Sequence, residues 1–390
     1  MCFSVKSQIS CFPLNLSSLN LSHHPIIPAE LRAFSQNITT LTSLTCSRMD
    51  SINSNDLLLI AECFPLLEEL DLSYPRKLED YSFLNGVETL SLTLFKLTKI
   101  NLSGHYYMND TSLFNLFKNC KLLQEVIMFG CRSITKVGIV SALCERPTLR
   151  SLSFTNYFES QKFVVLYELV GNYPSLSEIR MEYIPLNMKY IIYEENNIED
   201  SNSVMNFVVR PQLKSLSLTC NWLRDKNIRR FASIFPNLQM VDLGWCYNIS
   251  NEGIFHILRR CGNIRHLNLA YGVVTLEGLN FEVPKLEVLN LSHTTVDDET
   301  LYVISKNCCR LLQLSLKMCN HITKKGVMHV VENCTQLREI DLRDCHQVHA
   351  SIVDDMVFSR PSLRKIATPP GFDLRSKNRE LFSRNGCLVY

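Results

Sequence analysis

Apolar residues recur along the chain in a phrase of fixed form, L-x-x-L-x-L, in which L is Leu or another aliphatic residue. One copy runs from Cys308 to Cys319 and another from Cys334 to Cys345, and every anchor moves by 26 residues between them. Such regular spacing indicates stacked copies of one structural unit. The middle anchors of fourteen phrases serve as markers: Leu19, Leu44, Leu70, Ile100, Val126, Leu152, Ile179, Leu216, Val241, Leu267, Leu289, Leu314, Ile340 and Ile366.

The alternation at the end of each phrase predicts a short strand, whose anchors point inward and whose intervening residues point outward. A helical stretch follows, for example Gly326 to Asn333. One such coil cannot bury its apolar side alone, so the coils must stack. The pattern therefore predicts an α/β fold, a leucine-rich-repeat solenoid of horseshoe form. Parallel strands are expected on the concave face and helices on the convex face.

Two further columns of residues predict how a coil turns into its helix. Hydroxyl side chains precede the helix and are suited to cap its free N–H groups, namely Thr135, Ser250 and Thr323. Glycines recur at a constant offset and are expected to let neighbouring coils approach closely, namely Gly138, Gly253 and Gly326.

Three stretches depart from the regular step. Tyr81 to Phe95 also contains a matching phrase but lies too close to the next one, so we predict an outer helix there. A step of 37 residues before Leu216 predicts an inserted loop near 182–210, in which Glu194 to Ser203 reads as a polar projection. That loop is either a neutral excursion or a contact for a partner or small ligand. We expect one solenoid of about fourteen coils over 1–370 and a C-terminal cap or tail over 371–390.

Composition narrows the class of partner. The chain has 390 residues, 46% of them hydrophobic, and a net charge of +2. This balance gives no general attraction to nucleic acid or to a membrane surface. There is no apolar run long enough to span a membrane, and Met1 to Ser10 lacks the apolar core of a signal peptide. We therefore expect no nucleic-acid or membrane partner, and a cytoplasmic and/or nuclear location.

Sixteen cysteines could indicate a metal site or a catalytic thiol, but half of them fall into two columns of the repeat. We expect those to be small buried thiols that donate weakly to backbone. Zinc sites favour C-x2-C pairs, which are absent, and composition alone leaves a Cys/His/Asp nucleophile open without any local signature for one. His321 and His346, and the pair His23-His24, read as turn residues rather than ligands. We predict no enzyme, no catalytic residue, no metal site and no cofactor.

The outward positions of the ladder are the predicted contact surface. Fourteen strands spaced by about 4.8 Å give a ladder roughly 65 Å long, which suits a protein or peptide partner. Aromatic and arginine side chains dominate interface energies. The selected candidates on the concave face are Glu125, Phe129, Phe154, Arg180, Trp245, His266, Asp341 and Arg343. The alternative is a mixed, solvated surface without a hot spot.

The frame C-x2-L-x2-L-x-L-x2-C-x2-[IL]-[TS] resembles the cysteine-containing, ribonuclease-inhibitor-like repeats of F-box/LRR proteins, particularly the large plant set. The resemblance covers about Leu16 to Ile366. It implies a solenoid that selects protein substrates for an SCF-type ubiquitin ligase, in ubiquitin-dependent protein catabolism. In that family an N-terminal F-box docks a Skp-type adaptor.

The first phrase here starts at Leu16, which leaves too few residues for an F-box. We expect a truncated or degenerate chain, or a gene model without its first exon, and a Skp-type adaptor only if an F-box exists upstream. Two other functions stay open. One is a free-standing interaction or inhibitor scaffold without a ligase link, and the other is a small-ligand co-receptor.

Overall fold

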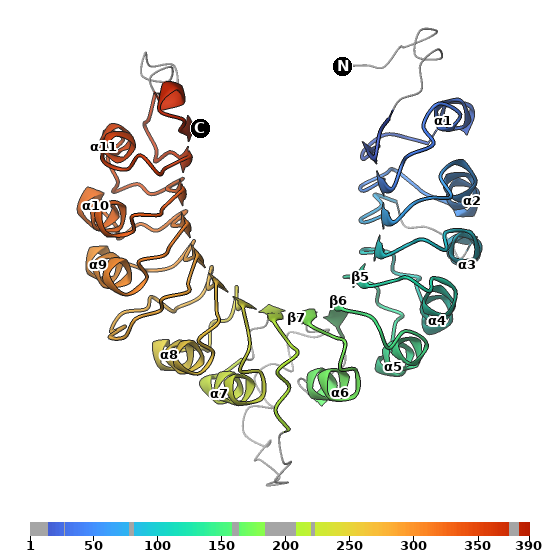
Figure 1. The fold of residues 1–390 in the computed structure, drawn as a ribbon, viewed down its shortest axis with the longest axis horizontal. Coiled ribbons are helices and arrows are strands. Elements are labelled where there is room, and N and C mark those ends of the chain that lie inside the picture. The colour runs from blue at the N-terminus through green and yellow to red at the C-terminus, as the bar shows by residue number, and fades with distance from the viewer. Residues whose placement is uncertain are drawn as a thin grey trace. The chain divides into compact units, whose positions relative to one another are not determined.

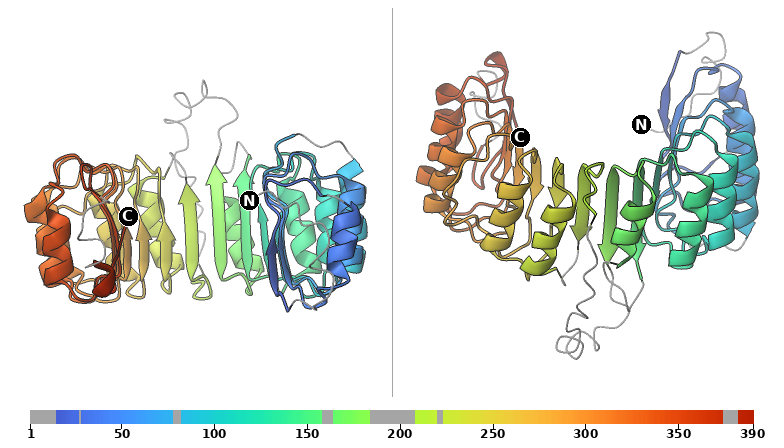
Figure 2. Two further views of the ribbon diagram at one scale, coloured as in Figure 1. Left: turned by 90° about the horizontal axis from the view of Figure 1, so that it is seen from above. Right: turned by 60° about the horizontal axis from the view of Figure 1, so that its bottom comes forward.

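A computed structural model describes residues 15–26, 28–77, 82–157, 164–183, 208–219, 223–373 and 382–390. The chain divides into two compact units, Met1–Glu199 and Asp200–Tyr390, and each is described by itself. In both units strands line one side and helices the other, as Figure 1 shows and the two turned views of Figure 2 repeat. We call these sides the strand face and the helix face.

The first unit alternates strands and helices along the chain. Its strands are β1 (Ser18–Asn20), β2 (Ser43–Thr45), β3 (Glu69–Asp71), β4 (Lys99–Asn101), β5 (Glu125–Met128), β6 (Ser151–Asn156) and β7 (Glu178–Tyr183). Its helices are α1 (Pro28–Ser35), α2 (Ser54–Cys63), α3 (Ser82–Thr93), α4 (Asp110–Asn119), α5 (Lys136–Glu145) and α6 (Val164–Asn172). The strands pair in chain order and all pairs are parallel.

The second unit has the same construction, with eight strands and five helices among its described residues. Its strands are β8 (Ser215–Thr219), β9 (Met240–Asp242), β10 (His266–Asn268), β11 (Val288–Asn290), β12 (Gln313–Ser315), β13 (Glu339–Asp341), β14 (Lys365–Ala367) and β15 (Leu388–Val389). Its helices are α7 (Asp225–Ile234), α8 (Asn251–Arg260), α9 (Asp298–Asn307), α10 (Lys324–Asn333) and α11 (Ile352–Ser359). These strands also pair in parallel and in chain order.

The register of the sheet follows the marker residues. Each marker is the second residue of its strand, and markers pair directly within a unit, as Leu314 does with Ile340. The predicted architecture of parallel strands and helices is therefore confirmed. The described part of 371–390 adds a strand that has no full phrase, because Val389 of β15 pairs with Ile366.

The segment that imitates a strand phrase is helical, as predicted. Helix α3 buries Val87 and Leu90 and leaves Leu92 exposed. This one-sided burial is what a helix of the outer row requires, since only one of its sides meets the coil interior. Of the predicted insertion near 182–210, residues 184–207 lie outside the described part, including all of Glu194 to Ser203.

A carboxylate joins each coil to the next at the start of its helix. Asp298, the first residue of α9, accepts hydrogen bonds from the backbone N–H and the hydroxyl of Thr323, at 2.7 and 2.6 Å. Thr323 in turn caps α10 by accepting from the N–H of Lys325. The negative charge thus lies beside two helix N-termini, where it is electrostatically favoured. Gly326 faces the same carboxyl group and has no side chain to displace it.

This junction recurs in other coils, with one difference from the prediction. Thr135 caps α5 and binds Asp110 in the same manner. Ser250 was expected to cap α8 but makes no side-chain cap. Its hydroxyl donates to Asp225 of the preceding coil at 2.5 Å, so the junction between the coils forms there without the cap. The close approach expected at the three glycines is confirmed, because an added Cβ would collide with the aspartate in each case.

We predict that Gly326→Ala destabilises the protein. The new Cβ would lie 2.2 Å from Asp298 Oδ1 and 2.8 Å from its Cα, so backbone must move. Overpacking of this kind costs about 1–3 kcal/mol, which exceeds the ~1 kcal/mol that alanine gains over glycine inside a helix. Gly262→Ala is the matched control, because nothing lies within 4 Å of its Cβ position. Urea unfolding followed by circular dichroism measures both, and equal stability of the two variants would refute the packing argument.

Candidate protein-binding surface

In the second unit, side chains that follow the markers hold the turn at the end of each strand. Asp242, Asn268 and Asn290 each accept a hydrogen bond from the backbone N–H two residues ahead, at 3.0–3.1 Å. Such Asx turns fix the backbone locally. Asn268 also donates to Asp242 at 2.8 Å, which links neighbouring strands through their side chains. The middle of this strand face is therefore a rigid polar row.

The residue that ends each turn has a left-handed backbone. Trp245, Tyr271 and His293 have φ of 64°, 59° and 59°, a region that bulky residues seldom adopt. Their N–H groups donate to carbonyls of the following coil at 2.8–2.9 Å, which supports the conformation. The same position is left-handed in other coils of both units, so the conformation belongs to the repeat. What distinguishes these three coils is that they are consecutive and that each places a ring there.

The three rings form a continuous stack across adjacent coils. The ring centroids of Trp245 and Tyr271 lie 3.9 Å apart with planes 7° from parallel, and those of Tyr271 and His293 also lie 3.9 Å apart. Tyr247 meets the Trp245 ring edge-on at 6.4 Å. Trp245 remains 48% exposed, so a wide aromatic surface faces solvent. Exposed, pre-ordered aromatic rings are the usual anchors of protein interfaces.

One polar atom in this stack has no partner. Nε2 of His293 is buried and makes no hydrogen bond within the described part of the chain. A buried nitrogen in that state costs about 1–3 kcal/mol. Stacking against Tyr271 is the contact that positions this imidazole.

The charged candidates of the second unit lie further along the same face. His266 precedes the marker of β10 and is exposed, one coil from Trp245. Asp341 and Arg343 belong to the coil of β13, about 14 Å from β10 at the usual strand spacing. Arg343 donates to both oxygens of Asp341, at 3.0 and 2.6 Å, and this carboxylate raises the pKa of Arg343. Each thus largely neutralises the other.

Two candidates of the first unit also lie on the strand face as outward residues. Glu125 forms an ion pair with Lys99 of the adjacent strand at 3.0 Å. Arg180 in β7 is exposed, and two residues later Glu182 is half-buried. Burial raises the pKa of Glu182, and the Arg180 charge opposes that rise. Arg180 is therefore the freer of these two predicted contacts.

A second aromatic patch lies in the first unit, where glycines occupy the left-handed position. Gly104 has φ of 86°, and an added Cβ there would lie 3.2 Å from the Tyr74 ring. The Tyr74 ring therefore packs directly against Gly104. Tyr74 and Tyr106 are both exposed, and the Arg132 guanidinium lies 5.1 Å from the Tyr106 ring centroid. Among the described residues, this patch shows no stacked pair of rings. Its positive charge comes from Arg132.

Two of the predicted contacts are not available to a partner. Phe154 is 2% exposed, because it is the second residue after its marker and so occupies an inward position of the phrase. Phe129 is 8% exposed, and its backbone N–H and carbonyl both bond to the preceding coil. Their selection as exposed anchors was wrong, since both rings belong to the interior.

We predict opposite consequences for Phe154→Ala and Trp245→Ala. Removing a fully buried phenyl ring costs about 3–5 kcal/mol of unfolding free energy. Removing the Trp245 ring loses chiefly one stacking contact, about 1 kcal/mol, because half of it is already in water. Chemical denaturation of the two variants measures both values. A Trp245→Ala loss as large as that of Phe154→Ala would mean that the stack is part of the core.

The stack could have been found more completely from the sequence. Tyr271 and His293 follow their markers by four residues, as Trp245 does. Only Trp245 was selected, because its side chain is the conventional hot-spot type. The stacking itself depends on the left-handed turn, and no local pattern of residues predicted that conformation.

The cysteine columns hold the coils together and show no sign of a reactive site. Cys131, Cys319 and Cys345 donate to carbonyls of the preceding coil at 3.0–3.2 Å. Burial raises the pKa of Cys131 and of Cys345 to about 12, so these thiols stay protonated at neutral pH. The cysteines that the structure describes are free thiols. No group of three His, Cys, Asp or Glu residues suited to a metal occurs among the described residues.

Alkylation of the native protein tests this assignment. We expect iodoacetamide at pH 8 to modify the exposed Cys144 and Cys309 and to spare the column thiols, because only a thiolate reacts. Peptide mass spectrometry with and without denaturant gives the extent at each site. Modification of Cys131 as fast as that of Cys309 would show that the column is open to solvent.

Comparison with known proteins places the fold. No family model matches the chain. The BTB/POZ domain-containing protein FBL11 of Arabidopsis thaliana is 24% identical in a 264-residue alignment that covers 58% of this chain. The chain spans 27% of the length of that protein. Among the helices of the described residues, none is long and apolar enough to cross a membrane.

Solved structures share the architecture at low sequence identity. Rad7, from a yeast complex of Rad7 and Elc1, superposes with a TM-score of 0.62 at 16% identity and covers 93% of this chain and 88% of its own. The chain of a TLR13–ssRNA13 complex gives 0.53 at 19% identity, covering 90% of this chain and 45% of its own. At such low sequence identity, the likeness to these structures shows a shared fold and nothing about function. The chain is a leucine-rich-repeat solenoid, a scaffold whose strand face presents a pre-ordered aromatic surface.

Proposed function

We propose that this protein is a protein-binding scaffold that recognises its partner through the strand face and performs no catalysis. We further propose that it is the substrate-recognition part of an SCF-type ubiquitin ligase, acting in ubiquitin-dependent protein catabolism. The observation that carries the binding role is the Trp245–Tyr271–His293 stack. The ligase role extends it through the likeness of the repeat to F-box/LRR proteins.

The physical support for protein binding is that the stack is ordered before any partner arrives. Turns, cross-strand hydrogen bonds and ring stacking already fix the side chains, so binding pays little additional conformational entropy. Further along the same strand face the surface is polar and nearly neutral. Asp341 and Arg343 offset each other, as do Lys365 and Glu339. A nucleic-acid site would need an excess of cations here, so a protein segment fits better.

Support for the ligase role comes from the comparisons. FBL11 carries a BTB/POZ domain by name and matches this chain over part of its length. Rad7, which shares the fold, is found with Elc1 in its crystal structure. A repeat scaffold joined to a second module or subunit is thus one arrangement in which this fold occurs. By analogy, a Skp-type adaptor would bind this protein only through an F-box encoded upstream.

The free thiols support the proposed location. The described cysteines form no disulfide with one another, and several are buried in columns. Oxidising compartments favour disulfides, whereas the cytoplasm and nucleus keep thiols reduced. A cytoplasmic and/or nuclear scaffold is therefore part of the proposal.

Affinity purification from native tissue tests the binding role. Trp245→Ala is compared with Phe358→Ala, which removes another exposed aromatic ring, on α11 of the helix face. We expect the tryptophan variant to recover a partner at least about tenfold less well, as for a hot-spot residue, and the control to recover it normally. Quantitative mass spectrometry gives the ratio. Full recovery with Trp245→Ala would contradict recognition through the stack.

The same purification separates the two scaffold functions. In a ligase receptor, the partner should be captured together with a Skp-type adaptor when the upstream coding sequence is included, and its half-life should shorten when the chain is overexpressed. Capture of the partner without the adaptor, at unchanged half-life, would instead identify a free-standing interaction or inhibitor scaffold.

A further inference from the structure

The row of helices in the second unit is interrupted at one coil. The connection from β10 to β11 contains no helix, whereas α8 precedes it and α9 follows it, and Figure 1 shows the gap between these two. The markers Leu267 and Leu289 are 22 residues apart, a shorter step than the 25 or 26 residues of the second-unit coils that hold a ten-residue helix. Leu276 and Gly278 have left-handed backbones within this segment, which is incompatible with helix. One flank of α8 therefore faces an irregular segment.

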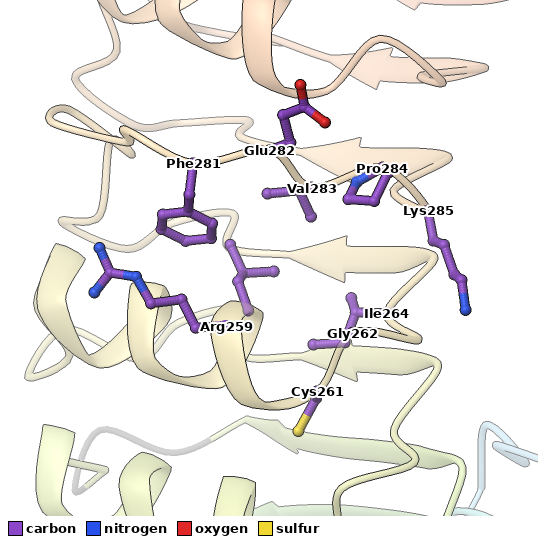
Figure 3. A pocket seen from close by; sticks show the side chains of 10 residues that line it. Arg259, Cys261, Gly262, Ile264, Phe281, Glu282, Val283, Pro284 and Lys285 are labelled. Carbon is purple, nitrogen blue, oxygen red and sulfur yellow. The ribbon is translucent and has the colours of Figure 1, made fainter.

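A cavity of about 260 Å³ lies between the C-terminal end of α8 and this segment. Figure 3 shows Phe281 and Val283 on one side and Ile264 and Gly262 on the other. The Phe281 ring is held edge-on by Phe255 at 5.9 Å, and Arg259 lies over it at 4.5 Å. The space is below the usual range for a whole small-molecule ligand, so it suits one large apolar side chain.

The charges around this cavity are mostly positive and lack acidic partners. Arg259 donates to the amide oxygen of Asn280 at 3.2 Å, and Lys285 donates to that of Asn263 at 2.6 Å. Neither cation forms an ion pair within the residues that the structure describes. The only carboxylate among the lining residues is that of Glu282, which is exposed. A cavity with apolar walls at Phe281, Val283 and Ile264, flanked by two unneutralised cations, is complementary to an apolar side chain beside carboxylates.

We infer that this groove, which we call the α8 groove, binds an acidic segment of a partner protein through one large apolar anchor. The anchor enters the cavity beside Phe281, and carboxylates on either side meet Arg259 and Lys285. The groove uses no residue of the aromatic stack. It is therefore a second binding site, and it does not depend on the function proposed for the strand face.

Fluorescence anisotropy with a defined probe tests the inference. The probe is a fluorescein-labelled peptide with one central phenylalanine between two pairs of glutamates, titrated with the full chain. Two companion peptides replace the phenylalanine by alanine or all glutamates by lysines. We expect the acidic phenylalanine peptide to bind at least about tenfold more tightly than either companion, because each loses one of the two complementary features.

Protein variants locate the binding. Arg259→Glu with Lys285→Glu should weaken the acidic peptide at least about tenfold, and Phe281→Ala should do so independently by removing the apolar wall. Lys226→Glu with Arg229→Glu is the matched control, since it reverses two exposed cations of α7 outside the groove. Thermal unfolding confirms that each variant is folded, and the charge variant suffices if Phe281→Ala is not.

Two results would overturn the inference. One is equal binding of the phenylalanine and alanine peptides, which would indicate attraction by charge alone. The other is an equal loss of affinity in the α7 control, which would place the peptide elsewhere. Because Trp245→Ala should leave this affinity unchanged, failure of the α8 groove and failure of the strand-face proposal are distinguishable.

Discussion

The rest of this structure depends on one constraint, that a single coil cannot satisfy itself. A coil buries its apolar anchors only against its neighbours. Its polar groups have the same need. The Thr323 hydroxyl donates to Asp298 of the preceding coil. In the same way, the Cys345 thiol donates to the carbonyl of Leu316, which belongs to the coil before its own. Apolar and polar requirements are thus met across the same junctions, so a change at one junction affects two coils.

The candidate binding surface is a consequence of this stacking. Because the strands pair in strict register, any position of the repeat becomes a column of side chains at nearly constant spacing. The turn after the strand adds a left-handed residue whose N–H bonds to the following coil. When consecutive coils place rings there, the register brings them into van der Waals stacking, as for Trp245 and Tyr271. The ordered aromatic surface therefore needs no special loop or ligand.

The sequence was sufficient for the repeat and insufficient for its surface. The markers located fourteen strands because a period-two phrase fixes both the strand and its inward side. The same rule places Phe154 at an inward position of the repeat, so its aromatic type was not a sufficient reason to expect it on the surface. Ser250 shows a different difficulty: its hydroxyl donates to an aspartate of the neighbouring coil, as those of Thr135 and Thr323 do, but it makes no cap, and the residue pattern does not separate it from those two. The α8 groove results from the missing helix between β10 and β11. Its shape depends on how side chains of neighbouring coils pack there, and the sequence pattern does not describe that packing.

The central claim is that the strand face, through its aromatic stack, is where the partner binds. Site-specific photocrosslinking in cells tests it most directly, with a benzophenone amino acid in place of Tyr247 beside the stack and, separately, in place of Phe358 on the helix face. We predict that the partner recovered by the native chain crosslinks from position 247 and not from position 358. Crosslinking of that partner from position 358 alone would contradict it.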